Sequence, residues 1–140
     1  MIAPDHKVKQ LLAALEESDT VKNRLALSHA YLERKQYKEA IQVLEVCRLG
    51  VHKDDPEVLG QLAYSYFANG DSQKTKETIL VMKGNFHKIE SREIHLLYAM
   101  SLQRLGEKNE ALKEYEALIP KYVGEEARCR YALFKCIKAF

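Results

Sequence analysis

The residue types best suited to catalysis are scattered along this chain of 140 residues. No two of its histidines have the spacing of a metal-binding pair such as HExxH. The glycine patterns that cradle phosphates and the GxSxG nucleophile motif do not occur. The five histidines are His6, His29, His52, His87 and His95. His29 is the candidate for a dyad with a Ser or Cys, but nothing orients it. We therefore predict a protein that is not an enzyme and that needs neither a metal nor a cofactor.

The cysteines form an odd set of three: Cys47, Cys129 and Cys136. None of them has metal-ligand spacing with another Cys or a His. On a helix, Cys129 and Cys136 would lie about 10 Å apart along the axis, which is too far for a disulfide. We expect three reduced thiols with packing roles, in a cytoplasmic or cytosol-like reducing compartment.

The composition is that of an ordinary globular protein, with 46% hydrophobic and 30% charged residues. A net charge of +2 is too small to indicate binding to nucleic acid or to an anionic membrane. The apolar stretch near the start, residues 11–15, is far too short for a signal sequence or a membrane span. We expect no direct membrane insertion of this segment, which is either a soluble protein or the soluble part of a longer one.

Helical periodicity runs along the chain, and no segment alternates long enough to indicate a strand. A pair of small residues, twelve positions apart, recurs three times along the chain. The pairs are Ser28 with Ala40, Ala63 with Thr75, and Ala99 with Ala111. Large residues follow at fixed offsets and would fill the space between helices: Tyr31, Leu44, Tyr66, Ile79 and Tyr115. The period is 35 and then 36 residues, which is typical of a repeat of helix pairs.

Helix-start signals fall between the periodic segments. Asp19 or Thr20 is suited to cap the helix that follows it, and Asp55 followed by Pro56 has the chemistry of a helix N-terminus. Ser91 is a candidate cap for a third such helix.

The turn inside each helix pair should come seven residues after the first small residue. Gly70 and Gly106 stand at this position in repeats two and three, and Lys35 stands there in repeat one. Lys35 therefore weakens the turn signal of the first repeat.

This pattern resembles the tetratricopeptide repeat (TPR), and the resemblance covers residues 21 to about 121. The tryptophan that often opens the motif is replaced by Arg24, Leu59 and His95. The resemblance implies an all-α protein, an α-α superhelix built as a right-handed solenoid of antiparallel helix pairs. It also implies a binding surface for a protein partner.

Following the register to both ends predicts one solenoid domain, 1–140, with about eight helices. Its expected parts are an N-terminal half-repeat helix at 5–18, repeats at 20–53, 55–89 and 91–121, and a C-terminal half-repeat helix at 124–140.

In stacked repeats of this kind, the first helices of the units line a concave groove. A stripe of residues beside the small residues on each first helix should face this groove, and the stripe is mostly apolar. The alternative for its leucines is that they are simply buried in the core. The expected partner-binding residues are Leu25, His29, Leu32, Tyr64, Phe67, Leu96, Met100 and Arg104. Tyr64 and Phe67 would be the anchors, because Gly60 leaves room one turn earlier. Such a groove suits an apolar or amphipathic peptide.

Two other ligands fit this groove poorly. The family's carboxylate grip uses lysines, an asparagine and an arginine, whose places here hold Leu25, His29, Gln61, Glu93 and Leu97. The cations are missing, and Glu93 would repel a carboxylate. Repeat proteins that read RNA place polar residues in the groove, so we expect no nucleic-acid partner either.

The last predicted helix is apolar around too much of its circumference to bury one face only. Its candidate assembly surface comprises Leu133, Phe134, Ile137 and Phe140. The alternative function is therefore structural self-assembly, as a homodimer or as a segment of a longer, possibly membrane-anchored, TPR protein. A third hypothesis, which rests on architecture alone, is a cytosolic secretion-chaperone-like TPR protein.

Overall fold

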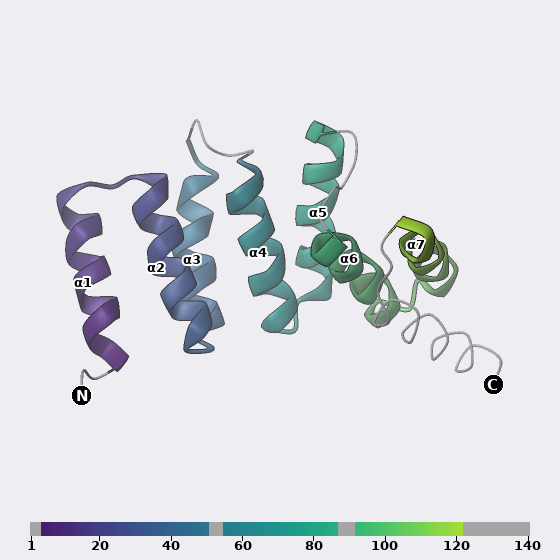
Figure 1. The fold of residues 1–140 in the computed structure, drawn as a ribbon, viewed down its shortest axis with the longest axis horizontal. Coiled ribbons are helices and arrows are strands. Elements are labelled where there is room, and N and C mark those ends of the chain that lie inside the picture. Colours follow the sequence, from purple (N-terminus) through teal and green to yellow (C-terminus); the bar gives the residue numbers. More distant parts are fainter. Residues whose placement is uncertain (1–3, 51–54, 87–91, 122–140) are drawn as a thin grey trace. The chain divides into compact units, whose positions relative to one another are not determined.

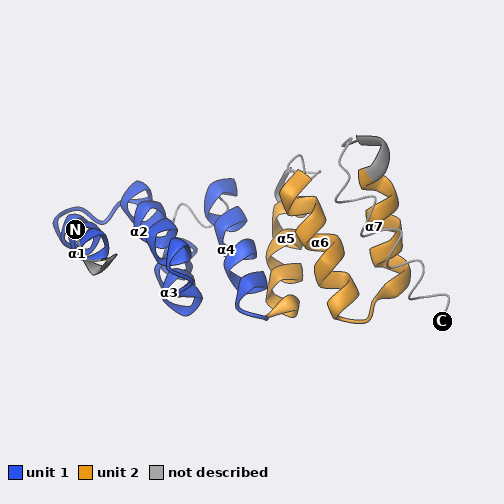
Figure 2. Cartoon of the chain, turned by 60° about the horizontal axis from the view of Figure 1, so that its bottom comes forward, with its two compact units in different colours: residues 1–70 blue, residues 71–140 orange. Residues whose placement is uncertain are grey.

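The computed structural model describes residues 4–50, 55–86 and 92–121. Over this part of the chain every regular element is an α-helix (Figure 1). The helices are α1 (Pro4–Glu17), α2 (Val21–Glu33), α3 (Tyr37–Cys47), α4 (Pro56–Ala68), α5 (Ser72–Phe86), α6 (Arg92–Arg104) and α7 (Lys108–Lys121). The chain divides into two compact units, unit 1 with residues 1–70 and unit 2 with residues 71–140 (Figure 2).

In unit 1 each helix packs against the next one along the chain, and α2 also contacts α4. Contact between helices that are two apart in the sequence is typical of stacked helix pairs, because each pair rests on its neighbour. The Thr20 side chain accepts a hydrogen bond from the backbone N–H of Asn23 at the start of α2. Asp55 accepts bonds from the N–H groups of Glu57 and Val58 at the start of α4. Both caps stand at predicted helix starts.

Two apolar clusters hold unit 1 together. The first cluster consists of buried residues of α3 and α4, namely Leu44, Cys47, Val58, Leu62 and Tyr66. Side chains of α2 pack against this cluster. The Tyr66 hydroxyl donates a hydrogen bond to the Glu45 carboxylate, so its one polar atom has a partner. The second cluster joins α1 to α2 through three buried residues: Val8, Leu27 and Ala30.

In unit 2, α6 packs against both α5 and α7. Tyr115 of α7 is fully buried, and its hydroxyl donates to Gln103 Oε1 at 2.8 Å. The Lys76 ammonium of α5 lies 2.7 and 2.8 Å from the two carboxylate oxygens of Glu107, just before α7. An apolar core and a paired charge therefore both connect the elements of this unit.

The small residues that define the repeat are all completely buried. Each has no exposed surface: Ser28, Ala40, Ala63, Thr75, Ala99 and Ala111. The hydroxyl of Thr75, the bulkiest of them, donates to the Asp71 carbonyl oxygen at 2.9 Å. Small side chains at these positions let helices approach closely, as the packing pattern predicts.

The prediction of an all-α protein of packed helix pairs is confirmed for the described residues. Predicted helix 5–18 corresponds to α1, and predicted repeats 20–53 and 91–121 contain α2 with α3 and α6 with α7. The division between units 1 and 2 falls inside predicted repeat 55–89. The predicted helix at 124–140 lies outside the described residues. The handedness of a solenoid stays a prediction.

Candidate functional site

The candidate site is formed by the faces of α2 and α4 that the core of unit 1 does not use. On α4, the buried residues are Val58, Leu59, Leu62, Ala63, Ser65 and Tyr66. Helical periodicity places Gly60, Gln61 and Tyr64 on the remaining side of this helix. On α2, Leu27, Ser28 and Ala30 are buried, whereas His29 and Glu33 lie on the opposite side of the helix and Leu32 lies at the edge between the two sides.

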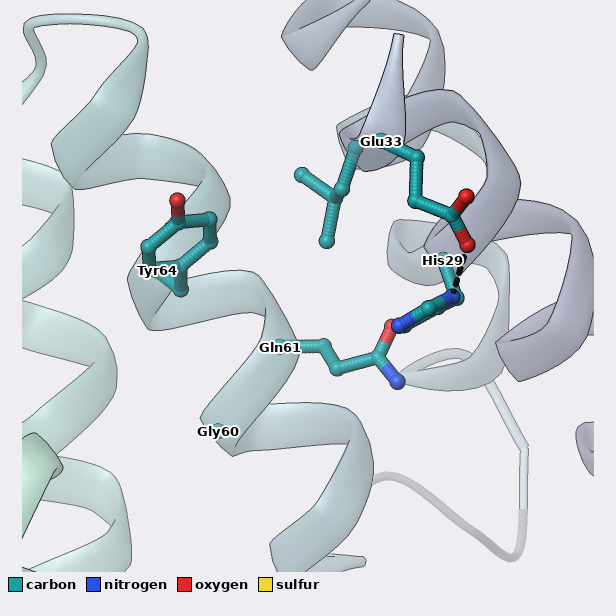
Figure 3. Close-up of a pocket in the computed structure, with 6 residues that line it drawn as sticks. His29, Glu33, Gly60, Gln61 and Tyr64 are labelled. Carbon is teal, nitrogen blue, oxygen red and sulfur yellow. Dashed lines mark ion pairs between the residues drawn. The ribbon is translucent and has the colours of Figure 1, made fainter. Parts of the chain in front are cut away.

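These two faces enclose a hollow of about 380 Å³ (Figure 3). It is lined by His29, Leu32, Glu33, Gly60, Gln61 and Tyr64. The Tyr64 ring lies on the α4 side, with His29 and Glu33 opposite it on α2. All of the lining belongs to unit 1.

Tyr64 is the large apolar group that the hollow leaves accessible. It is 48% exposed, although α4 is otherwise a well-buried helix. Gly60 lies one helical turn earlier and carries no side chain to cover the ring. Leu32, on the other wall, is partly buried. An aromatic ring and an aliphatic side chain thus face a common space.

Polar groups occupy the rim and the floor of the hollow. His29 Nδ1 lies 2.8 Å from Glu33 Oε1, one helical turn away on α2. Lys7 Nζ of α1 lies 3.5 Å from the same oxygen. Gln61 extends from α4 toward the His29 ring (Figure 3), and its Oε1 is buried without a hydrogen-bond partner. The hollow therefore combines apolar walls with acceptor atoms.

The structure brings three of the predicted groove residues together in this hollow: His29, Leu32 and Tyr64. Leu25 instead packs against the α3–α4 core cluster, the simple burial that was the alternative for the leucines. Phe67 is partly buried near the end of α4.

The other predicted residues lie elsewhere. In unit 2, α6 carries Leu96, which is buried, Met100, which is partly buried, and Arg104, which is exposed. The predicted assembly residues Leu133, Phe134, Ile137 and Phe140 lie outside the described residues.

Two lining residues, Glu33 and Gln61, were not among the predicted groove residues. Glu33 follows His29 by four positions, so the two side chains share a face of α2. Gln61 precedes Tyr64 by three positions on α4. The predicted stripe follows positions 25, 29 and 32 and their equivalents 60, 64 and 67 in the next repeat, so it passes beside Glu33 and Gln61.

Unit 2 holds a second cluster of titratable groups between its helices. His95 of α6 is 8% exposed, and its Nε2 lies 2.5 Å from Glu114 Oε2 of α7. The hydrogen bond from His95 holds the pKa of Glu114 below its ordinary value, against the opposing effect of burial. Burial raises the pKa of Tyr98, and the Lys83 ammonium lies 5.9 Å from the centre of the Tyr98 ring. This cluster joins α5, α6 and α7.

A search against models of known protein families finds no match, and a search of curated proteins finds none either. Among the residues that the structure describes, no helix has the length and apolarity needed to cross a membrane. In the same part of the chain, no group of three or more His, Cys, Asp or Glu side chains is placed to hold a metal ion.

Proposed function

We propose that this protein is a non-enzymatic, TPR-like interaction module that binds an amphipathic segment of a protein partner. The repeat of helix pairs supports the class, because six small residues at a period of 35 and 36 are all fully buried. Three positions, each seven residues after the first small residue of its repeat, share a positive φ: Lys35, Gly70 and Gly106. We also propose a reducing, cytoplasmic location, in which Cys47 remains a free thiol within the core of unit 1.

The half-exposed Tyr64 ring beside the hollow is the observation that carries the proposal. Fully burying a large apolar side chain contributes about 1.5–3 kcal/mol. Micromolar binding requires about 8 kcal/mol. The hollow therefore supplies one anchor for a bound segment, and neighbouring surface has to contribute the remainder.

Selection from a displayed library of random 12-residue peptides on the immobilised full chain tests this function. Enriched peptides should bind with micromolar Kd by calorimetry. Tyr64→Ala should weaken binding at least tenfold, and the double variant Tyr64→Ala/Phe67→Ala should abolish it. Circular dichroism checks that each variant remains folded.

Leu80→Ala is the matched control, because Leu80 is 42% exposed on α5 and does not line the hollow. This variant should bind the peptides as tightly as the parent chain. Failure to enrich any peptide, or unchanged binding by the Tyr64→Ala chain, would overturn the proposal.

A further inference from the structure

The polar atoms around the hollow are mainly acceptors. His29 Nδ1 lies 2.8 Å from a Glu33 carboxylate oxygen, to which its N–H donates. Gln61 Oε1 is a first acceptor, which is buried and without a donor. A buried acceptor without a partner is costly, so a ligand that supplies a donor removes that cost.

Glu33 provides the second acceptor. Its contacts with His29 and with Lys7 are both made by Oε1. Its Oε2 has no partner among the residues that the structure describes. The Lys7 contact is 3.5 Å long between side chains that are 61% and 51% exposed, so it holds the carboxylate only weakly. Glu33 is also the only carboxylate in the lining.

The Tyr64 ring is the other group in the hollow that can bind a cation. A cation is attracted to the face of an aromatic ring, and guanidinium groups also stack on such faces. Gly60 leaves the space above the α4 surface beside this ring open. One wall thus offers an aromatic face, and the rim and floor offer acceptors (Figure 3).

We propose that this hollow receives a basic side chain of the bound segment, Arg in preference to Lys. The cation lies against the Tyr64 ring and donates hydrogen bonds to Glu33 Oε2 and, once the Gln61 side chain turns toward it, to Gln61 Oε1. Arg is preferred because its planar guanidinium has five N–H donors and stacks on aromatic rings, whereas the Lys ammonium is a compact point charge. The proposal rests on the proposed peptide-binding function and specifies the chemistry of its partner.

Bulk electrostatics does not favour such a partner. The chain carries a net charge of +2, so a non-specific attraction would enrich acidic peptides. Enrichment of basic peptides would therefore report the local chemistry of the hollow.

The test uses the peptides selected on the full chain. They should contain an Arg or Lys next to an aromatic or aliphatic residue. Replacing that Arg by citrulline, which keeps the shape and removes the charge, should raise the Kd at least tenfold. On the Glu33→Gln chain this arginine-to-citrulline ratio should fall to about threefold or less. On the Glu17→Gln control, which removes an exposed carboxylate from the end of α1, the ratio should be unchanged.

The two proposals fail in different ways. Peptides that bind through Tyr64 but contain no basic residue would overturn the basic-side-chain proposal and leave the peptide-binding function standing. The basic-side-chain proposal also falls if citrulline binds as well as arginine, or if Glu33→Gln leaves the ratio unchanged. If no peptide is enriched at all, the peptide-binding function falls and this inference falls with it.

Discussion

Lys35 and Gly70 adopt the same left-handed backbone conformation at equivalent positions of successive repeats, with φ of 60° and 87°. The N–H of Lys35 bonds to the Leu32 carbonyl at 3.0 Å, and the N–H of Gly70 bonds to the Phe67 carbonyl at 3.1 Å. Gly106 repeats this geometry with φ of 82°. The turn therefore imposes the conformation whichever residue occupies it, and Lys35 adopts it with a side chain that disfavours it.

The first prediction follows from this strain. Lys35→Gly should raise the free energy of unfolding by about 1 kcal/mol, because glycine adopts positive φ without a steric penalty. Gly70→Ala and Gly106→Ala should lower it by about 1 kcal/mol. An added Cβ would meet no atom within 4 Å at either glycine, so backbone strain is the expected cost. Urea denaturation followed by circular dichroism measures these changes.

Gly84→Ala provides the control with the opposite sign. Gly84 lies inside α5, has no positive φ, and also has open space around an added Cβ. Alanine is a better helix former than glycine by up to about 1 kcal/mol, so this variant should be stabilised. Equal effects of alanine at Gly70 and Gly84 would contradict the assignment of strain to the turn.

The helices were predictable because their signals are local. The cap chemistry of Thr20 and Asp55 and the glycine turns act within a few positions along the chain, and the period of 35 and 36 residues repeats this local pattern. Lys35 shows the limit of this approach: its residue type weakens the turn signal, but its backbone has the positive φ that the two glycines also have. The division into two units was not predicted, because it depends on which helices contact one another in the folded chain.

The second prediction concerns buried hydroxyl groups. Ser28 is fully buried, and its Oγ has no hydrogen-bond partner. The equivalent positions in the other repeats hold Ala63 and Ala99. Ser28→Ala removes an unsatisfied polar atom without creating a large cavity, so it should raise the free energy of unfolding by about 1 kcal/mol.

Ser65→Ala is the matched comparison for Ser28→Ala. Ser65 is also fully buried on a helix, but its Oγ donates to the Gln61 carbonyl at 2.7 Å. Alanine there loses a satisfied hydrogen bond, so the stability should change little or fall. Thermal and urea unfolding of both variants would refute this account if the two serines gave the same gain.

The candidate site was predictable only in part. His29, Leu32 and Tyr64 were found because apolar and aromatic residues at helical spacing trace one side of a helix. Leu25 belongs to the same stripe, but its neighbours from α3 and α4 bury it. Those neighbours come from distant parts of the sequence, so the stripe alone does not decide between groove and core. The unpartnered Gln61 oxygen also depends on three-dimensional neighbours.

The third prediction concerns Cys47. This thiol is 6% exposed, and burial raises its pKa, so the reactive thiolate is disfavoured. In a Cys129→Ser/Cys136→Ser background, Cys47 should react with a chromogenic aromatic disulfide at pH 8 at least tenfold more slowly than in 6 M guanidinium chloride. A reaction as fast in buffer as in denaturant would show that Cys47 is accessible and not part of the core.

The fourth prediction is a pH dependence that comes from Glu114. The hydrogen bond from His95 lowers the pKa of Glu114 in the folded chain below its ordinary value of 4.5. The unfolded chain therefore binds a proton at this group first as the pH falls. The stabilisation is complete above about pH 4.5, and it is lost as the pH falls further through the folded pKa.

Glu114→Gln should lower the free energy of unfolding at pH 7 and reduce its loss between pH 5 and pH 3. The control Glu16→Gln, at an exposed position of α1 in unit 1, should keep the acid dependence of the parent chain. Urea denaturation at a series of pH values measures both slopes, and an unchanged slope for Glu114→Gln would show that the His95–Glu114 pair does not stabilise unit 2.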